Sequence, residues 1–433
     1  MTATPLGGAP GIQPPGSRLA RALTYPFRLG ATEEDWPSTQ FGRLALINVL
    51  SSAGDAMVAV ALAGSVFVSV PLNAARGRTA LGLVMTMLPF AVVAPFTGPA
   101  ADRFRRGKRL VLFLAAAART AAALMMAAWI HNLALFPAAF LSLVASKTHA
   151  VARSALIPAV TDRESDLVPA NSRLTLGSGL ASAAAAPVGA AVYAVFGSRA
   201  LLDVDALVFA LAASLSLILL RPAKTAPAGP IAPHERKPPT PVPLLRGAVA
   251  VGGVRAATGF LTALVAFGFR AQGAPVIWYG VVAAAGVGGN LVGAGMAPSV
   301  RRLVRSDRWL VYGSALAIAG VALAVVPLRW QHGQVAAAVL AVSTGLAGCV
   351  GKTTFDSMVQ VQIGDHARAR AFARFEASFQ AAWVLLALVP TIVHVPLTAG
   401  FVVIAVVLAG LVVTATATPA DRLLRRGPAA PPP

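Results

Sequence analysis

The stretch GPAADRFRRGKR (residues 98–109) concentrates five cationic side chains and one carboxylate between two apolar runs. These runs, residues 79–97 and 110–129, are each long enough to cross a bilayer, which takes about 20 apolar residues in a helix. A short charged segment between two such runs predicts a loop at one face of a membrane.

The composition of the whole chain is that of a membrane protein. Of its 433 residues, 57% are hydrophobic and 12% charged, and the mean hydropathy is +0.72, whereas soluble domains carry about 25% charged residues. The net charge of +20 is compatible with nucleic-acid binding. The cations fall mostly in alternate loops, however, and no aromatic platform accompanies them. We therefore expect a lipid bilayer as partner and no nucleic acid.

Neither a metal nor another cofactor is expected. The six histidines are scattered without metal-ligand spacing, and Cys349 is the single cysteine of the chain, so no disulfide framework can form. The histidine His149 lies among small residues and is read as a hydrogen-bonded packing element, although an imidazole can also titrate near neutral pH.

Twelve apolar segments predict an all-α membrane protein. They lie near residues 43–70, 79–97, 110–129, 133–155, 172–196, 200–220, 250–269, 275–297, 309–327, 335–361, 371–393 and 397–416. A Pro-rich polar stretch between the sixth and the seventh cannot span and is typical of a linker. We therefore expect a tail (1–42), a six-helix bundle (43–220), a linker (221–246), a second six-helix bundle (247–416) and a second tail (417–433).

The loop charges predict the orientation of the chain. Lys and Arg are abundant in the loops on one side, which include 98–109, the linker and both tails, and sparse on the other. By the positive-inside rule, both termini are cytoplasmic in a multi-pass protein of the cell inner (cytoplasmic) membrane. The first forty residues lack the apolar region of a signal peptide.

The opening loop resembles the signature G-x-x-x-D-R-x-G-R-R of the major facilitator superfamily, found between its second and third spans. Gly98, Asp102 and Arg103 match in register, while Arg105 occupies the usual glycine position. Three more segments, ALIPAVTDRESDLVPANS (155–172), DALVF (205–209) and VQVQIGDHARARAF (359–372), resemble the drug, macrolide and siderophore exporter branch.

The resemblance implies two pseudo-symmetric six-helix bundles, a site near the bilayer midplane between them, and alternating access by a monomer. It also implies a conformational latch on the cytoplasmic side, in which Asp102 meets the start of the eleventh span. The latch residues are Gly98, Asp102, Arg103, Arg106 and Arg109. A bend in the fifth span is expected at Pro187 and Gly189.

Ionisable side chains within the predicted spans are candidates for an ion-coupling site or a substrate cavity, because each costs about 2.5–3.5 kcal/mol at the centre of a span. The candidates are Asp55, Arg119, Asp205, Lys352 and Asp356. Asp55 is the leading candidate for coupling to protons or another cation, and a structural pair with Arg119 is its alternative.

Two of these candidates have a plainer interpretation. Lys352 and Asp356 stand at the i, i+4 spacing of an ion pair within one helix, which favours a self-neutralised pair. Asp205 lies near the outer end of its span, which favours an interfacial or helix-start role. The small residues of GVVAAAGVGGNLVGAG (280–295) predict tight helix packing rather than a dinucleotide site, because no strand precedes them.

These features together predict a secondary active transporter rather than an enzyme. The acids within the spans form no catalytic dyad, and no phosphate-cradling loop for an ATP-driven pump is present. Proton-coupled export of an amphipathic or hydrophobic small molecule, drug-like or siderophore, is the function that we expect. The alternative is a non-transporting membrane sensor or assembly partner with a transporter-like fold.

Overall fold

The computed structural model describes residues 24–29, 36–62, 107–130, 132, 134–161, 163–220, 241–275, 277–304, 306–327, 333–364 and 367–417. All regular structure within these ranges is helical. The predicted span 79–97 lies outside the described residues, and so do the latch residues Gly98, Asp102, Arg103 and Arg106.

The long helices follow the predicted spans. They are α2 (Gln40–Leu62), α5 (Gly107–Ala128), α6 (Leu135–Leu156), α7 (Leu167–Leu220), α8 (Pro241–Ala271), α9 (Ile277–Leu303), α10 (Asp307–Ala324), α11 (Gly333–Gln362), α12 (Arg368–Ile392) and α13 (Leu397–Ala417). Short 3-10 helices occupy Tyr25–Phe27, Trp36–Ser38, Ile157–Ala159 and Glu164–Asp166. Since α7 contains two predicted spans, the described helices correspond to eleven of the twelve.

Helices are the structure that such apolar segments must adopt, because hydrocarbon offers no partner for an unpaired backbone amide. Within the described ranges, nine helices are long and apolar enough to cross a membrane. The longest helix, α7 with 54 residues, contains Gly197 with φ 81° and ψ 177°, a conformation suited to glycine. The chain reverses there, so that Leu201 lies beside Gly189, and the predicted break between residues 196 and 200 is confirmed.

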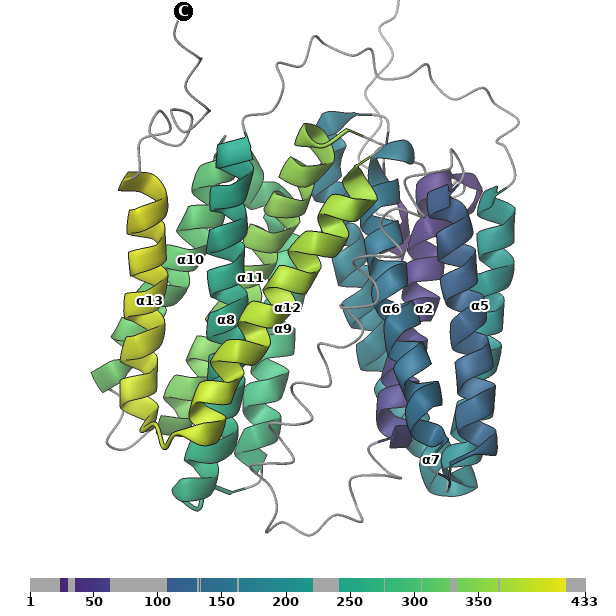
Figure 1. Cartoon of the computed structure of the whole chain (residues 1–433), viewed down its shortest axis with the longest axis horizontal. Helices are drawn as coiled ribbons and strands as arrows, with labels where there is room; N and C mark the ends of the chain where they lie inside the picture. The colour runs from purple at the N-terminus through teal and green to yellow at the C-terminus, as the bar shows by residue number, and fades with distance from the viewer. Residues whose placement is uncertain are drawn as a thin grey trace, which may run out of the picture.

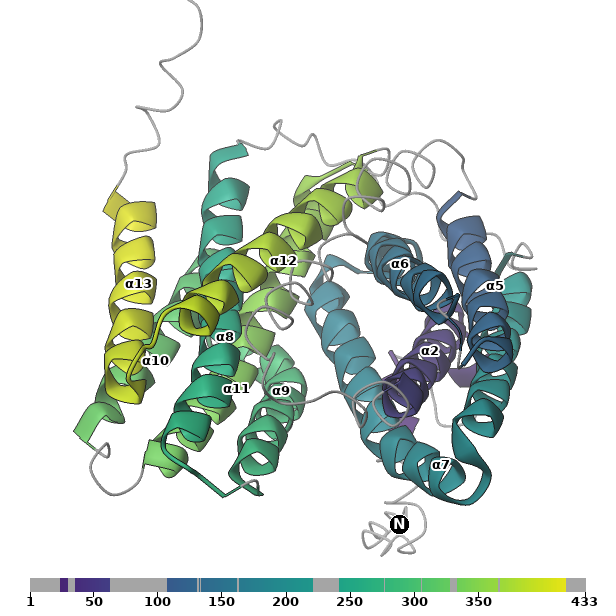
Figure 2. The same ribbon diagram turned by 60° about the horizontal axis from the view of Figure 1, so that its bottom comes forward.

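The helices form two bundles, here called the N-half (α2, α5, α6 and α7) and the C-half (α8 to α13) (Figure 1). Figure 2 gives a second view, in which α9 of the C-half lies beside α7 of the N-half, as their contacts require. The linker end of the molecule, at the top of Figure 1, is the end where α7 finishes at Leu220 and α8 begins at Pro241. The opposite end is called the far end.

Small residues bring α9 and α11 into backbone contact. A Cβ atom at Gly345 of α11 would lie 2.7 Å from the backbone nitrogen of Asn290 in α9, and one at Gly289 would lie 2.9 Å from the carbonyl carbon of Val342. No larger residue fits at either position without moving the helices apart. The tight packing predicted for residues 280–295 is therefore confirmed.

Candidate functional site

A buried arginine joins two helices of the N-half. Arg119 of α5 is completely buried and forms an ion pair with Asp55 of α2, whose side chain is 46% exposed. The same guanidinium donates a hydrogen bond of 2.9 Å to the carbonyl oxygen of Ser51, one turn earlier in α2. Ser146 of α6 donates to the second oxygen of Asp55 at 3.2 Å. The structural pairing considered as an alternative for Asp55 is thus present, and its side chain remains partly exposed.

A second carboxylate belongs to the same site. Asp205 of α7 is completely buried, and no described group donates a hydrogen bond to either of its oxygens. It lies within electrostatic range of Arg119 and Asp55. Phe209, one turn further along α7, stacks under the guanidinium at 3.9 Å. We call Asp55, Arg119 and Asp205 the Arg119 triad.

The burial of Asp205 corrects its interfacial assignment from sequence. The carboxylate lies eight residues, more than two turns, beyond the break at Gly197, which places it inside the bundle. Two carboxylates then share one guanidinium. With both carboxylates ionised the triad carries a net charge of −1, and one bound proton would make it neutral.

The close approach of α2 and α7 at the triad depends on Gly54. A Cβ atom at this position would collide with the ring of Phe209 and would lie 2.8 Å from Oδ1 of Asp205. The absence of a side chain at Gly54 therefore allows Asp205 to lie next to Asp55 and Arg119.

A second group of charges lies in the C-half. Nζ of Lys352 lies 2.6 Å from a carboxylate oxygen of Asp356 and 2.6 Å from one of Glu376 in α12. The ion pair predicted at i, i+4 is confirmed, but it is not self-contained, because Glu376 competes for the same ammonium group. Phe379 of α12 presents its ring 5.8 Å from Nζ of Lys352.

Further cations from both halves surround these carboxylates. Arg153 of α6 interacts electrostatically with Asp356 and Glu376, and Glu376 also interacts with Lys147 of α6 and Arg255 of α8. We call these five residues, together with Lys352, the six-charge cluster. It holds four cations and two carboxylates, and it brings cations of the N-half toward acids of the C-half.

The two groups are connected along one face of α2. Asn48, Ser51 and Asp55 stand at i, i+3 and i+7, the spacing of one helix face. Asn48 accepts a hydrogen bond of 2.9 Å from Arg153 of the six-charge cluster, whereas Ser51 and Asp55 contact Arg119. Between them, Nδ1 of the buried His149 lies 3.5 Å from the hydroxyl of Ser51, which fits the packing role expected for this histidine.

The halves are joined at the linker end by amide side chains. Gln360 near the end of α11 accepts a hydrogen bond of 2.8 Å from Asn171 of α7 and donates one of 3.0 Å to the carbonyl oxygen of Ser154 in α6. All three residues are buried. Apolar contacts support this clasp, since Val168 of α7 lies in one cluster with Val350 of α11. We call Gln360, Asn171 and Ser154 the linker-end clasp.

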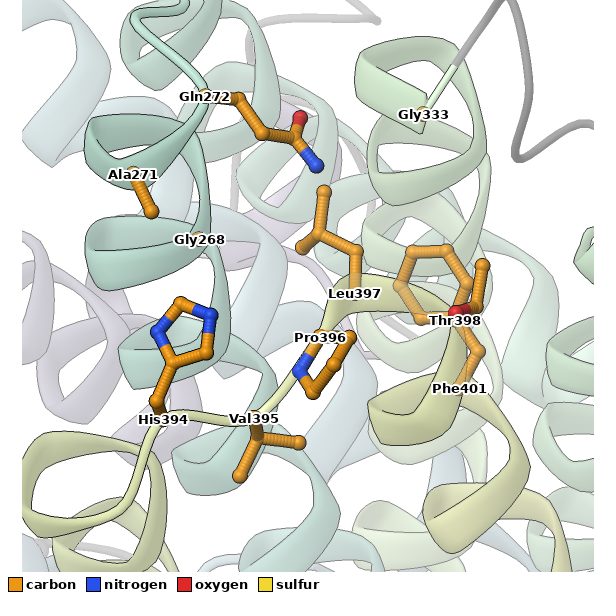
Figure 3. Close-up of a pocket in the computed structure, with 10 residues that line it drawn as sticks. All are labelled: Gly268, Ala271, Gln272, Gly333, His394, Val395, Pro396, Leu397, Thr398 and Phe401. Carbon is orange, nitrogen blue, oxygen red and sulfur yellow. The ribbon is translucent and has the colours of Figure 1, made fainter.

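A cavity of about 270 Å³ lies elsewhere, at the far end of the C-half. The end of α8, the start of α11, the connection from α12 to α13 and the start of α13 enclose it, and Gln272, His394 and Thr398 supply its polar side chains (Figure 3). No member of the Arg119 triad or the six-charge cluster lines it. We therefore do not place the substrate path there.

The remaining predicted residues lie apart from both groups. Arg109, the one described latch residue, is in the first turn of α5 and donates a hydrogen bond of 2.8 Å to the side chain of Gln40 in α2. Pro187 lies inside α7, and a Cβ atom at Gly189 would make only ordinary contacts of 3.5 Å with Leu201 and Met57. The latch and the bend remain predictions.

Four residues of the six-charge cluster are not among the candidates named from the sequence: Lys147, Arg153, Glu376 and Arg255. The last two are the hardest to find. Glu376 follows a run of arginines and reads as part of a charged loop, although it lies in the third turn of α12. Arg255 is a single cation in a long apolar run, where averaging over the span hides it. Counting every charge by its depth from the helix start, rather than by loop, would have found both.

Comparison with known proteins gives one family match and several relatives. The chain matches the family model described as Major Facilitator Superfamily over residues 44–387. It is 30% identical over 415 residues to Uncharacterized protein ML2143 of Mycobacterium leprae (strain TN), which covers 87% of this chain and 71% of the relative. Over 135 residues, 29% of this chain and 23% of the relative, it is 39% identical to Uncharacterized protein MT0899 of Mycobacterium tuberculosis (strain CDC 1551 / Oshkosh).

Two solved structures share the fold at low sequence identity. One is a bacterial homologue of the iron transporter ferroportin in an outward-facing state, with a TM-score of 0.64 and 15% identity over 89% of this chain and 100% of the other. The second is FucP, a transporter of the same superfamily in the outward conformation, with a TM-score of 0.60 and 10% identity over 87% and 97% of the two chains.

Proposed function

Because the chain belongs to the Major Facilitator Superfamily and has the fold of its secondary transporters, we propose that it exports an amphipathic or hydrophobic small molecule in exchange for protons. The superfamily consists of multi-pass membrane carriers rather than typical enzymes. The exporter branch, the proton and the direction are parts of this proposal, and the sequence segments that resemble drug, macrolide and siderophore exporters favour them.

The Arg119 triad is the observation that carries the proposal. A carboxylate near the middle of a membrane helix is costly unless it is paired or meets water, and Asp55 is paired and 46% exposed. A proton arriving from water reaches Asp55 first, because Asp205 is completely buried. Protonation removes the attraction of Asp55 for Arg119, and Arg119 keeps Asp205 as its counter-charge. The pair between α2 and α5 therefore weakens when a proton binds.

The response to this change would be a rocking of the two halves. Hydrogen bonds between the described parts of the halves lie at the linker end, where the positive-inside rule puts the cytoplasm. In this arrangement the protein is closed toward the cytoplasm, and both structural relatives were solved in outward-facing states. Opening to the cytoplasm requires the linker-end clasp to break and the cations of α6 to leave the acids of α11 and α12.

The polar face of α2 connects the Arg119 triad, where the proton would bind, with the six-charge cluster between the halves. Weakening the Asp55–Arg119 pair frees α2 to shift, and the same face of α2 holds Arg153 through Asn48. Arg153 is one of the α6 cations that approach the C-half acids. A shift of α2 would thus change the attraction between the halves, as coupling between two states demands.

The test is transport by the full-length protein in proteoliposomes with an imposed pH gradient. A panel of lipophilic cations, macrolides and siderophores is offered to the wild type, to Asp55→Asn and to a control, Asp203→Asn. Asp203 is exposed and lies two residues from Asp205 on α7. We expect gradient-driven transport to fall by about tenfold or more in Asp55→Asn and to persist in the control.

Each contrary outcome has one meaning. Wild-type transport rates in Asp55→Asn would show that Asp55 has no part in coupling. Transport rates that do not depend on the pH gradient would show that protons are not the coupling ion. If neither these compounds nor amphipathic anions move under any gradient, the alternative of a non-transporting sensor or assembly partner takes the place of the transport proposal.

A further inference from the structure

Arg255 is a cation near the middle of a membrane helix. It is the fifteenth of the 31 residues of α8, and its side chain is exposed although most of this helix is buried. The neighbouring positions on the same face, Thr258 and Thr262, are also polar and at least partly exposed. A lipid-facing stripe would be apolar, so this face of α8 is suited to water between the halves.

Arg255 has no partner of its own within the described residues. Among the residues that the structure describes, neither a hydrogen bond nor an ion pair involves its guanidinium, and Glu376, the acid with which it interacts electrostatically, is already paired with Lys352. Arg119 and Arg153, by contrast, are held by Asp55 and Asn48. An arginine near the middle of a membrane helix has a higher free energy of insertion than an apolar residue, so its presence without a partner calls for a function.

The surroundings favour a negative ligand over a positive one. The six-charge cluster has twice as many cations as carboxylates, so a metal ion or organic cation entering this region meets net repulsion. An anion meets a free guanidinium, whose planar set of donors suits a carboxylate or sulfonate. Arg255 therefore has the position and the chemistry of an anion-binding residue.

An apolar surface lies one helical turn along α8 from Arg255. Trp383 of α12 packs against Gly259, one turn further along α8, where a Cβ atom would lie 3.0 Å from Cγ of the indole. The indole is half-buried, so part of it remains available for contact. A charged group bound at Arg255 would bring an attached ring or alkyl chain beside this surface.

We infer that the transported molecule is an amphipathic anion whose acid group binds Arg255. That the bound molecule is transported rests on the proposed function. The binding of an anion at Arg255 rests on the geometry of the site alone. The inference narrows the substrate class from amphipathic or hydrophobic compounds to those with a carboxylate or sulfonate.

Binding is tested without transport, on the full-length protein in nanodiscs. The probes are 2-naphthoate, 2-naphthalenesulfonate and decanoate, with 2-naphthamide and 2-naphthylmethylammonium as neutral and cationic counterparts. Cys349 is buried and unpaired, so its reaction with a thiol-sensitive dye reports thermal unfolding. Each probe is titrated and its apparent dissociation constant is taken from the shift in the unfolding midpoint.

We expect at least one anion to stabilise the wild type and the counterparts to do so about tenfold more weakly or not at all. Arg255→Gln should lose this preference and Arg255→Lys should keep part of it. Both should unfold at the wild-type midpoint without probe, because the side chain is exposed and unpaired. Arg270→Gln, which changes an exposed arginine at the far end of the same helix, should bind like the wild type.

The inference is overturned if none of the three anions is preferred, if a cation is preferred, or if Arg255→Gln binds anions as the wild type does. Its failure is distinguishable from failure of the proposed function. Anions that bind but do not move in proteoliposomes contradict transport and leave the site intact. If only neutral or cationic compounds move with the gradient, the transport function is supported and the inference that the substrate is an anion is overturned.

Discussion

The ammonium group of Lys352 lies 2.6 Å from the carboxylate of Glu376, and this ion pair ties α11 to α12 inside the C-half. Both side chains are mostly buried, with exposed fractions of 17% and 27%. Lys352 also binds Asp356, so one cation balances two acids at close range. The arrangement makes Lys352 more important for stability than either carboxylate, because its removal leaves two charges without their nearest partner.

Lys352→Met should therefore destabilise the folded protein by about 3–5 kcal/mol, the cost of leaving buried charge unpaired. Glu376→Gln should cost less, since Asp356 keeps its partner. The measurement is the thermal unfolding midpoint of the full-length protein in nanodiscs.

Arg301→Met is the matched control for this comparison. Arg301 pairs with Asp307 at 2.9 Å between the end of α9 and the start of α10, and the exposed fractions of these side chains, 25% and 29%, are close to those of Lys352 and Glu376. Arg301 pairs with one acid and Lys352 with two, so Arg301→Met should lower the midpoint less than Lys352→Met does. Equal losses in the two variants would show that the second acid does not make the Lys352 pairs special.

The packing of α2 on α7 gives a second prediction. Gly54→Ala adds a methyl group where the ring of Phe209 and the carboxylate of Asp205 already lie. Overpacking of this kind costs about 1–3 kcal/mol and moves the side chains that it meets. Since these side chains surround Arg119, gradient-driven transport should fall together with the unfolding midpoint.

A glycine in open surroundings serves as the control. A Cβ atom at Gly313 of α10 would have nothing within 4 Å, so Gly313→Ala meets no steric conflict. Alanine is the better helix former by about 0.5–1 kcal/mol, and the variant should be at least as stable as the wild type. If Gly54→Ala behaves like Gly313→Ala in both assays, the close approach of α2 to the triad has no role.

The sequence pattern predicted the features that depend on neighbouring residues alone: the helices, one ion pair within a helix and one helix break. Apolar runs of bilayer length predicted the described spans, with ends that differ by up to nine residues, because hydrocarbon leaves the backbone little choice but helix. The pair of Lys352 with Asp356 followed from their i, i+4 spacing, because side chains four residues apart lie next to each other on one helix. The break at Gly197 was found where the apolar run paused, and glycine is the residue that tolerates its positive φ.

Contacts between distant helices were beyond such patterns. Glu376 reaches Lys352, and Gln360 reaches Asn171 across 189 residues, only because of how the bundles dock. Asp205 was misjudged for a related reason: depth along a span was clear, but not that Gly54 opens a space for its carboxylate beside Arg119. Sequence identifies charges in a membrane, whereas tertiary packing decides which of them meet.

The linker-end clasp gives the last prediction. If transport requires the halves to separate at this end, a covalent link between Asn171 and Gln360 should stop it. Both positions are changed to cysteine in a Cys349→Ser background and joined with a reducible bifunctional thiol reagent. We expect transport to be lost in proportion to cross-linking, measured by mass spectrometry, and to return when the link is reduced.

The control pair lies within one half. Arg301 and Asp307 are as close as the clasp residues, with 2.9 Å between their side chains, but both belong to the C-half. Cross-linking cysteines at these two positions should leave transport unchanged, because rigid-body rocking does not alter distances inside a bundle. Transport that continues after complete cross-linking of residues 171 and 360 would mean that the halves do not separate there, and the alternating-access mechanism proposed from the clasp would be wrong.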